Sequence, residues 1–69
     1  MSSSDISAYS KDLERQRDSL LKDLKALDAK QKKGEIAEEQ YNEKRREIER
    51  ALVEVMDRLA QAKFLMGKA

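Results

Sequence analysis

The sequence contains no cysteine, histidine, proline or tryptophan, and each absence excludes a class of structure or site. Without cysteine the chain forms neither disulfides nor thiolate metal sites, a composition typical of a reducing compartment. Without histidine and cysteine, the usual nucleophilic triads and histidine-containing zinc sites are also excluded. Without proline, no residue with a fixed φ and a missing N–H breaks or kinks a long helix.

Glycine and long apolar runs are scarce as well. The two glycines form no phosphate-binding loop, and no run of about 18 apolar residues or signal-peptide core is present. We therefore expect a cytoplasmic protein that is not an enzyme. We also expect it to have no cofactor, metal site, small-molecule substrate or membrane association.

Charged residues make up 42% of the 69 residues, hydrophobic residues 39% and aromatic residues only 4%. Such a composition, with apolar residues at regular spacing, is typical of long helices and coiled coils. The net charge of +1 provides no strong overall field to attract nucleic acid or an anionic membrane.

Gly34 divides the chain into two segments with helical periodicity. Lysines precede Gly34 and glutamates follow it, as expected where one helix ends and another begins, because cations favour a helix C-terminus and anions an N-terminus. We predict helices over about 5–33 and 36–66. They form a single domain, 5–67, between a flexible N-terminus, 1–4, and a tail, 68–69. The predicted hinge residues are Gly34, Ile36 and Tyr41.

Apolar residues recur every seven positions in both segments, which predicts an all-α fold: an antiparallel two-helix coiled-coil hairpin. The first segment contributes Ile6, Leu13, Leu20 and Leu27, and the second contributes Tyr41, Ile48, Val55 and Ala62. In the hairpin, Leu27 faces Tyr41, Leu20 faces Ile48, Leu13 faces Val55, and Ile6 lies near Ala62.

A continuous helix in a parallel coiled coil is the alternative, because the heptad rows keep one phase across Gly34. The seam is weakest there, with Gln31, Gly34, Glu38 and Arg45 at core positions. A glycine inside a helix also costs about 1 kcal/mol relative to alanine. The hairpin is therefore favoured.

Two helices bury only one stripe each, and so small a core rarely supplies more than about 3–5 kcal/mol. We expect the hairpin to be completed by dimerisation into a four-helix bundle or by docking on a larger protein. The second half of helix 36–66 has more apolar residues than its partner helix covers, which indicates an interface. The predicted interface comprises Ile6, Tyr9, Leu13, Val53, Met56, Ala60, Phe64, Leu65 and Met66. This favours a small accessory subunit that acts in protein assembly.

The alternative function is weak or indirect nucleic-acid binding through basic residues near the hinge. The candidate phosphate contacts are Lys30, Lys32, Lys33, Lys44 and Arg46. Interleaved glutamates dilute their field, and no aromatic residue is placed to stack on bases. A solvated tip is therefore the favoured interpretation.

The hinge region resembles the SHOCT family of short C-terminal domains, a helix, a Gly-x-Ile turn and a second helix. The matching residues, within 24–48, are Leu24, Leu27, Gly34, Ile36, Tyr41, Arg45 and Ile48. In place of the family's capping Ser or Thr the chain has Ala37, and in place of a glutamate it has Gln40; its helices also extend beyond the family's length. The resemblance implies an oligomerisation or interaction module.

Overall fold

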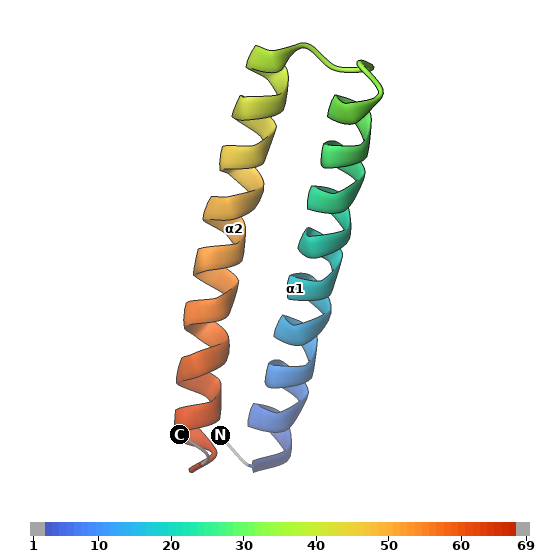
Figure 1. Cartoon of the computed structure of the whole chain (residues 1–69). Coiled ribbons are helices and arrows are strands. Elements are labelled where there is room, and N and C mark those ends of the chain that lie inside the picture. Colours follow the sequence, from blue (N-terminus) through green and yellow to red (C-terminus); the bar gives the residue numbers. More distant parts are fainter. Residues whose placement is uncertain (1–2, 68–69) are drawn as a thin grey trace.

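The computed structural model describes residues 3–67, which form two α-helices and, over that range, no strand. Helix α1 spans Ser3–Lys32 and helix α2 spans Glu38–Leu65. They run antiparallel, so that the start of α1 and the end of α2 lie at the end of the molecule opposite the connection, residues 33–37 (Figure 1). The predicted helical hairpin is confirmed, and the continuous helix is wrong. Of the predicted termini, residues 1–2 and 68–69 lie outside the described residues, whereas Ser3 and Ser4 are helical.

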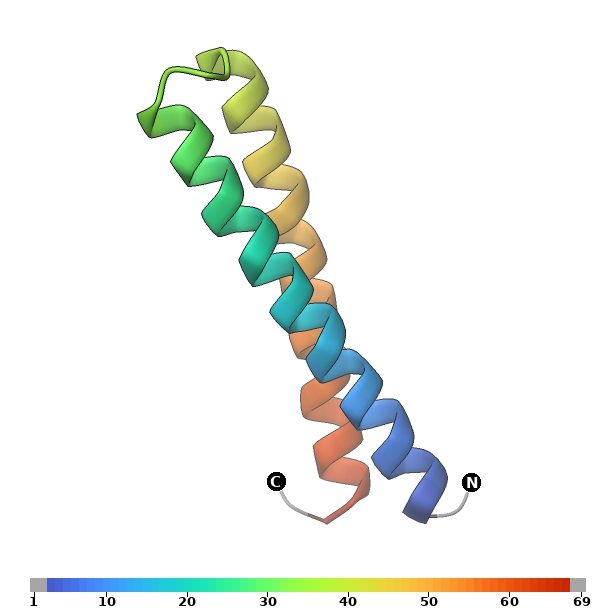
Figure 2. The same cartoon turned by 90° about the vertical axis from the view of Figure 1, so that its right-hand side faces the viewer.

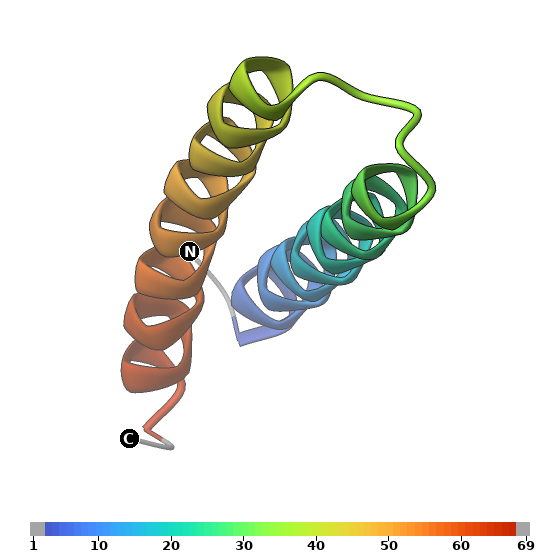
Figure 3. The same cartoon turned by 45° about the horizontal axis from the view of Figure 1, so that its top comes forward.

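The molecule is a narrow rod of two helices, with extents of 48 × 16 × 14 Å. The helices cross at a shallow angle (Figure 2). With the connection tilted towards the viewer, no third element of residues 3–67 covers either helix (Figure 3). The Cα radius of gyration is 15.4 Å, whereas a compact chain of this length would have about 11 Å. Much of each helix surface is therefore left exposed.

The α1 helix ends in a Schellman motif centred on Gly34. Gly34 has a φ of 71°, its N–H donates to the Gln31 carbonyl at 3.0 Å, and the Glu35 N–H donates to the Lys30 carbonyl at 2.9 Å. A side chain in this left-handed conformation would be strained. The sequence places glycine where the helix must end.

The α2 helix begins at Glu38, two residues later than predicted. Ala37 is extended (φ −68°, ψ 147°) and has no side-chain cap, and its carbonyl accepts the Tyr41 N–H at 2.9 Å. After the left-handed turn, Ile36 and Ala37 carry the chain across to the second helix axis, so they are unavailable to the helix. Glu38 and Glu39 lie in the first turn, where their negative charge interacts favourably with the unpaired backbone N–H groups at the start of the helix.

The core follows the predicted heptad rows. Leu13, Val55, Leu59 and Ala62 form one buried cluster with Leu20 packed against it, and Leu27 and Tyr41 are buried nearer the connection. The predicted pair of Leu13 and Val55 thus lies in one cluster. Ser10 is also buried, with 5% of its surface exposed. Because serine is polar, the spacing of apolar residues did not predict its burial.

Candidate interaction surface

Four residues of α2 form an exposed row on the side turned away from α1. Val53, Met56, Ala60 and Phe64 follow one another at spacings of three, four and four residues, so they share one face of the helix. At about 100° per residue, this face lies roughly 130° around α2 from the buried seam. Val53 is 68% exposed, Met56 49% and Phe64 69%. We call these four residues the outer row.

The other predicted interface residues are divided among different environments. Leu13, at 2% exposure, belongs to the hairpin's own core, so including it in an external surface was wrong. Ile6 and Met66 are partly buried at the open end, and Tyr9 is about half exposed on α1. The predicted single surface is thus reduced to the outer row with Leu65 beside it.

Leu65 extends the apolar surface around the end of α2. It is 69% exposed, and together with Ala60, Gln61 and Phe64 it lines a shallow hollow. Three of these four residues are apolar, so the hollow is a mainly apolar part of the surface. The sequence missed one further exposed apolar residue, Leu21 of α1, because its heptad position lies beside the seam.

A hydrogen-bonded group joins the two helices near the connection. The Tyr41 hydroxyl donates to Asp28 Oδ1 at 2.7 Å, and Arg45 Nη1 donates to the Tyr41 hydroxyl oxygen at 3.0 Å. Arg45 also lies 3.7 Å from Glu49 Oε1, and its guanidinium is 5.9 Å from the Tyr41 ring centroid. The polar Arg45 in the apolar row is thus accounted for by its contacts.

These contacts change how Tyr41 and Arg45 titrate. The hydrogen bond to Asp28 raises the pKa of Tyr41, because ionisation would remove the donated proton; burial raises it further, and Arg45 offsets part of the effect. The contact with Tyr41 raises the pKa of Arg45, with a smaller contribution from Glu49. The group acts as a structural clamp between the helices.

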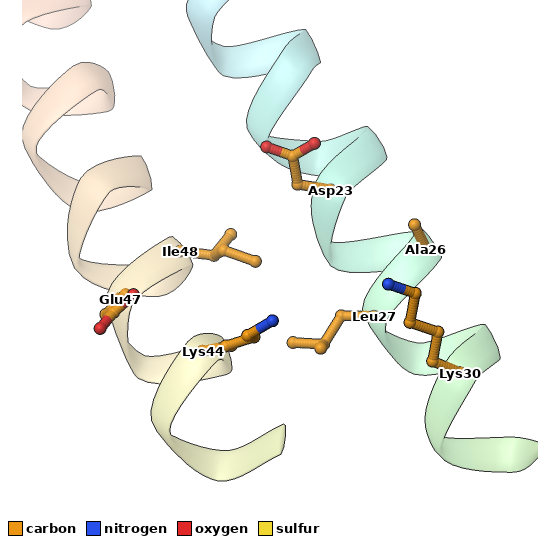
Figure 4. Close-up of a pocket in the computed structure, with 7 residues that line it drawn as sticks. All are labelled: Asp23, Ala26, Leu27, Lys30, Lys44, Glu47 and Ile48. Atoms are coloured by element: carbon orange, nitrogen blue, oxygen red, sulfur yellow. The ribbon is translucent and has the colours of Figure 1, made fainter. Parts of the chain in front are cut away.

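The cations proposed as phosphate contacts are spread around the tip. Lys30 and Lys44 come from opposite helices and line one groove of about 390 Å³; Leu27 lies between them, and Ile48 lies beside Lys44 on α2 (Figure 4). Asp23 and Glu47 line the same groove, so it holds two charges of each sign.

The remaining cations do not join this groove. Lys32 is the last residue of α1 and Lys33 lies in the turn. Arg46 Nε donates to the Asn42 carbonyl at 3.4 Å, and Arg46 follows Lys44 by about 200° around the helix. The five cations therefore form no continuous basic patch.

Within residues 3–67, no group of three or more acidic side chains is placed to hold a metal ion. Neither α1 nor α2, as far as they are described, is long and apolar enough to cross a membrane. No family model matches the chain, and no curated protein or solved structure is significantly similar to it. The outer row and the clamp therefore have to be interpreted from their own geometry.

Proposed function

We propose that this chain is a non-enzymatic protein–protein interaction module, a small accessory subunit that presents the outer row of α2 to another protein surface. The observation that carries the proposal is the exposure of Val53, Met56 and Phe64 in one helical row. Aligned apolar residues on a face that no other element covers favour association, because contact with a second surface removes them from water.

The small size of the hairpin core supports the same proposal. Among the residues whose burial the structure describes, six apolar ones are buried: Leu13, Leu27, Tyr41, Val55, Leu59 and Ala62. A two-helix core of this size is marginal on its own. A partner that binds only the folded hairpin stabilises it by mass action, so association and folding are expected to be coupled.

The resemblance of residues 24–48 to the SHOCT family points in the same direction, since that family consists of oligomerisation or interaction modules.

The experiment replaces Met56 and Phe64 together with aspartate. Two carboxylates in the outer row should abolish assembly, because an unpaired charge is costly to bury. Circular dichroism should report the same helical content as for the unassembled wild-type chain, since both side chains lie outside the seam. Arg50→Asp is the control, because it makes the same change of −2 in net charge at an exposed position outside the row.

Assembly is measured in two ways. Light scattering over a concentration series detects self-association, and co-purification with the tagged chain detects other proteins. If the double variant assembles like the wild-type chain in both assays, the outer row is not an interface and the proposal is wrong.

Nucleic-acid binding by the tip is less well supported, because Asp23 and Glu47 share the groove of Lys30 and Lys44. It makes a separate prediction. Nucleic-acid affinity that falls steeply with salt, and is lost on neutralising Lys32, Lys33 and Arg46, would favour it. Under this alternative the aspartate variant of the outer row binds nucleic acid as the wild-type chain does.

A further inference from the structure

The outer row and its flanking charges are arranged around Met56 so that they match those of a second, antiparallel copy of the same helix. Glu49 and Lys63 each lie seven residues from Met56, on opposite sides of it. Val53 precedes Met56 by three residues and Ala60 follows it by four. When two such helices are placed antiparallel with the Met56 positions together, Val53 meets Ala60, and Glu49 meets Lys63.

Charge decides between the two orientations in which α2 can pair with a second α2. A parallel pair would place Glu49 against Glu49 and Lys63 against Lys63, whereas an antiparallel pair places opposite charges together twice. Glu49 can reach a second chain, because 52% of its side chain is exposed while it pairs with Arg45 Nε at 3.7 Å within its own chain. The antiparallel pair is therefore favoured.

The antiparallel pair also accommodates the largest exposed side chain. Phe64 lies eight residues after Met56, so it reaches the segment of the second α2 that contains Arg46 and Glu49. The exposed Arg46 offers Phe64 an aliphatic stem and a guanidinium that stacks on an aromatic face. Small Ala60, about one turn from Met56, lets the helices approach closely.

The surface area of the chain is consistent with one such interface. A compact monomer of this mass exposes about 4,450 Å², whereas this hairpin exposes 5474 Å². The surplus is about 1,000 Å², and a standard interface buries about 800 Å² on each partner. With a net charge of only +1, overall repulsion between copies is small.

We propose that the partner of the outer row is a second copy of this chain. The two α2 helices pack antiparallel about a twofold axis at Met56, with Val53 against Ala60 and Glu49 against Lys63 of the second copy. This inference rests on the proposed function and names its partner. Residue pairs of an antiparallel twofold contact occur twice, so each substitution acts at two places.

The register is tested with a single introduced thiol, because the chain has no cysteine of its own. In the Met56→Cys variant the two thiols face each other across the axis. Oxidised glutathione, which takes up their two electrons and two protons, should then link them as a disulfide. The control is Glu54→Cys. Glu54 is exposed on another side of α2, where it lines a second groove with Leu20 and Val55. We expect the Met56→Cys dimer to form at least tenfold faster on a non-reducing gel.

The orientation is tested by exchanging charges. Glu49→Lys and Lys63→Glu should each weaken dimerisation about five- to tenfold, because each puts like charges together at two places. The double variant should return to within about twofold of the wild-type chain. Circular dichroism checks that the hairpin persists, since Glu49 also lies near Arg45.

Two outcomes would overturn the inference: equal disulfide rates at positions 56 and 54, or a wild-type chain that stays monomeric throughout the concentration series. The proposed function is judged separately. Suppose that the monomeric chain still co-purifies with another protein, and that the double variant Met56→Asp, Phe64→Asp does not. The outer row is then an interface with a different partner, and the proposed function stands. If those substitutions change nothing, both proposals fail.

Discussion

The Tyr41 hydroxyl donates a hydrogen bond of 2.7 Å to Asp28 Oδ1, and this bond joins α2 to α1 near the connection. Arg45 donates to the same hydroxyl oxygen at 3.0 Å. Apolar seams tolerate sliding by a heptad, because one leucine replaces another, whereas a hydrogen bond between two defined side chains is satisfied in one register only. The pair therefore sets the register of the hairpin at the end where the chain turns.

The clamp predicts a loss of stability at high pH. In the folded hairpin the pKa of Tyr41 is raised above its ordinary value of 10.0, first by the hydrogen bond to Asp28. A raised pKa in the folded state means that the hydroxyl's contribution is present in full below pH 10 and is lost as the pH rises through the folded value. We expect the thermal midpoint to fall across that interval, and Tyr41→Phe to remove this part of the fall.

The measurement combines melts followed by circular dichroism with phenolate absorbance. The chain has two tyrosines, so a Tyr9→Phe background leaves Tyr41 as the only phenol. At neutral pH, Tyr41→Phe should lower the midpoint by about 5 °C, since the two partly buried hydrogen bonds of the hydroxyl are lost. An absorbance titration of Tyr41 at or below its ordinary pKa would contradict the clamp.

The core makes a second prediction through two leucines that differ in burial. Leu13 is 2% exposed and Leu21 is 43% exposed. Leu13→Ala leaves a cavity in the central cluster and should cost about 2–5 kcal/mol, as much as the whole hairpin is expected to have. Leu21→Ala makes the same chemical change, with the same effect on helix propensity, and should cost about 0.5–1 kcal/mol.

Urea unfolding followed by circular dichroism at one protein concentration measures both variants. Leu13→Ala should be largely unfolded without urea, whereas Leu21→Ala should keep a cooperative transition. Comparable losses in the two variants would mean that the seam does not pass through Leu13.

The heptad spacing was sufficient to predict the fold, because burial of a helix stripe depends only on which residues share a face. Leu13, Val55 and Leu27 lie where their periodicity places them. The break at Gly34 was predictable for a similarly local reason, since the charges on either side of it match the ends of two helices. The boundaries were less accurate: Ile36 and Ala37 look helical by composition, but the reversal of the chain places Ile36 in a bend and Ala37 in an extended conformation.

The candidate surface was only partly predictable, because exposure depends on how the second helix packs. Periodicity identified Val53, Met56 and Phe64 as apolar residues beyond the seam, but it also assigned Leu13 to the outer surface. The hydrogen bond between Tyr41 and Asp28 was missed, since a heptad reading pairs Tyr41 with Leu27 and assigns no partner to its hydroxyl. Ser10 was missed because burial of a small polar residue leaves no signal in hydrophobic spacing.

The last prediction concerns Gly34. The two heptad rows keep one phase across it, so this glycine decides between the hairpin and a continuous helix. In the hairpin Gly34 has a φ of 71°, and an alanine there would cost about 1–2 kcal/mol of backbone strain. A Cβ at this position would meet no atom within 4 Å, so the cost arises from the backbone alone. In a continuous helix the same substitution gains about 1 kcal/mol. The two effects add, and Gly34→Ala should shift the equilibrium from the hairpin towards the continuous helix.

Small-angle scattering distinguishes the two forms, since a continuous helix over 3–65 would be about 95 Å long, whereas the hairpin measures 48 Å. Gly67→Ala is the control, because Gly67 has a similar φ of 74° but lies after α2, where no second helix follows within the described residues. We expect Gly34→Ala to show longer particles at raised concentration and Gly67→Ala to keep the hairpin's length. If both variants keep it, packing of Leu13 and Leu27 against α2 outweighs the turn. The seam would then determine the hairpin without the glycine.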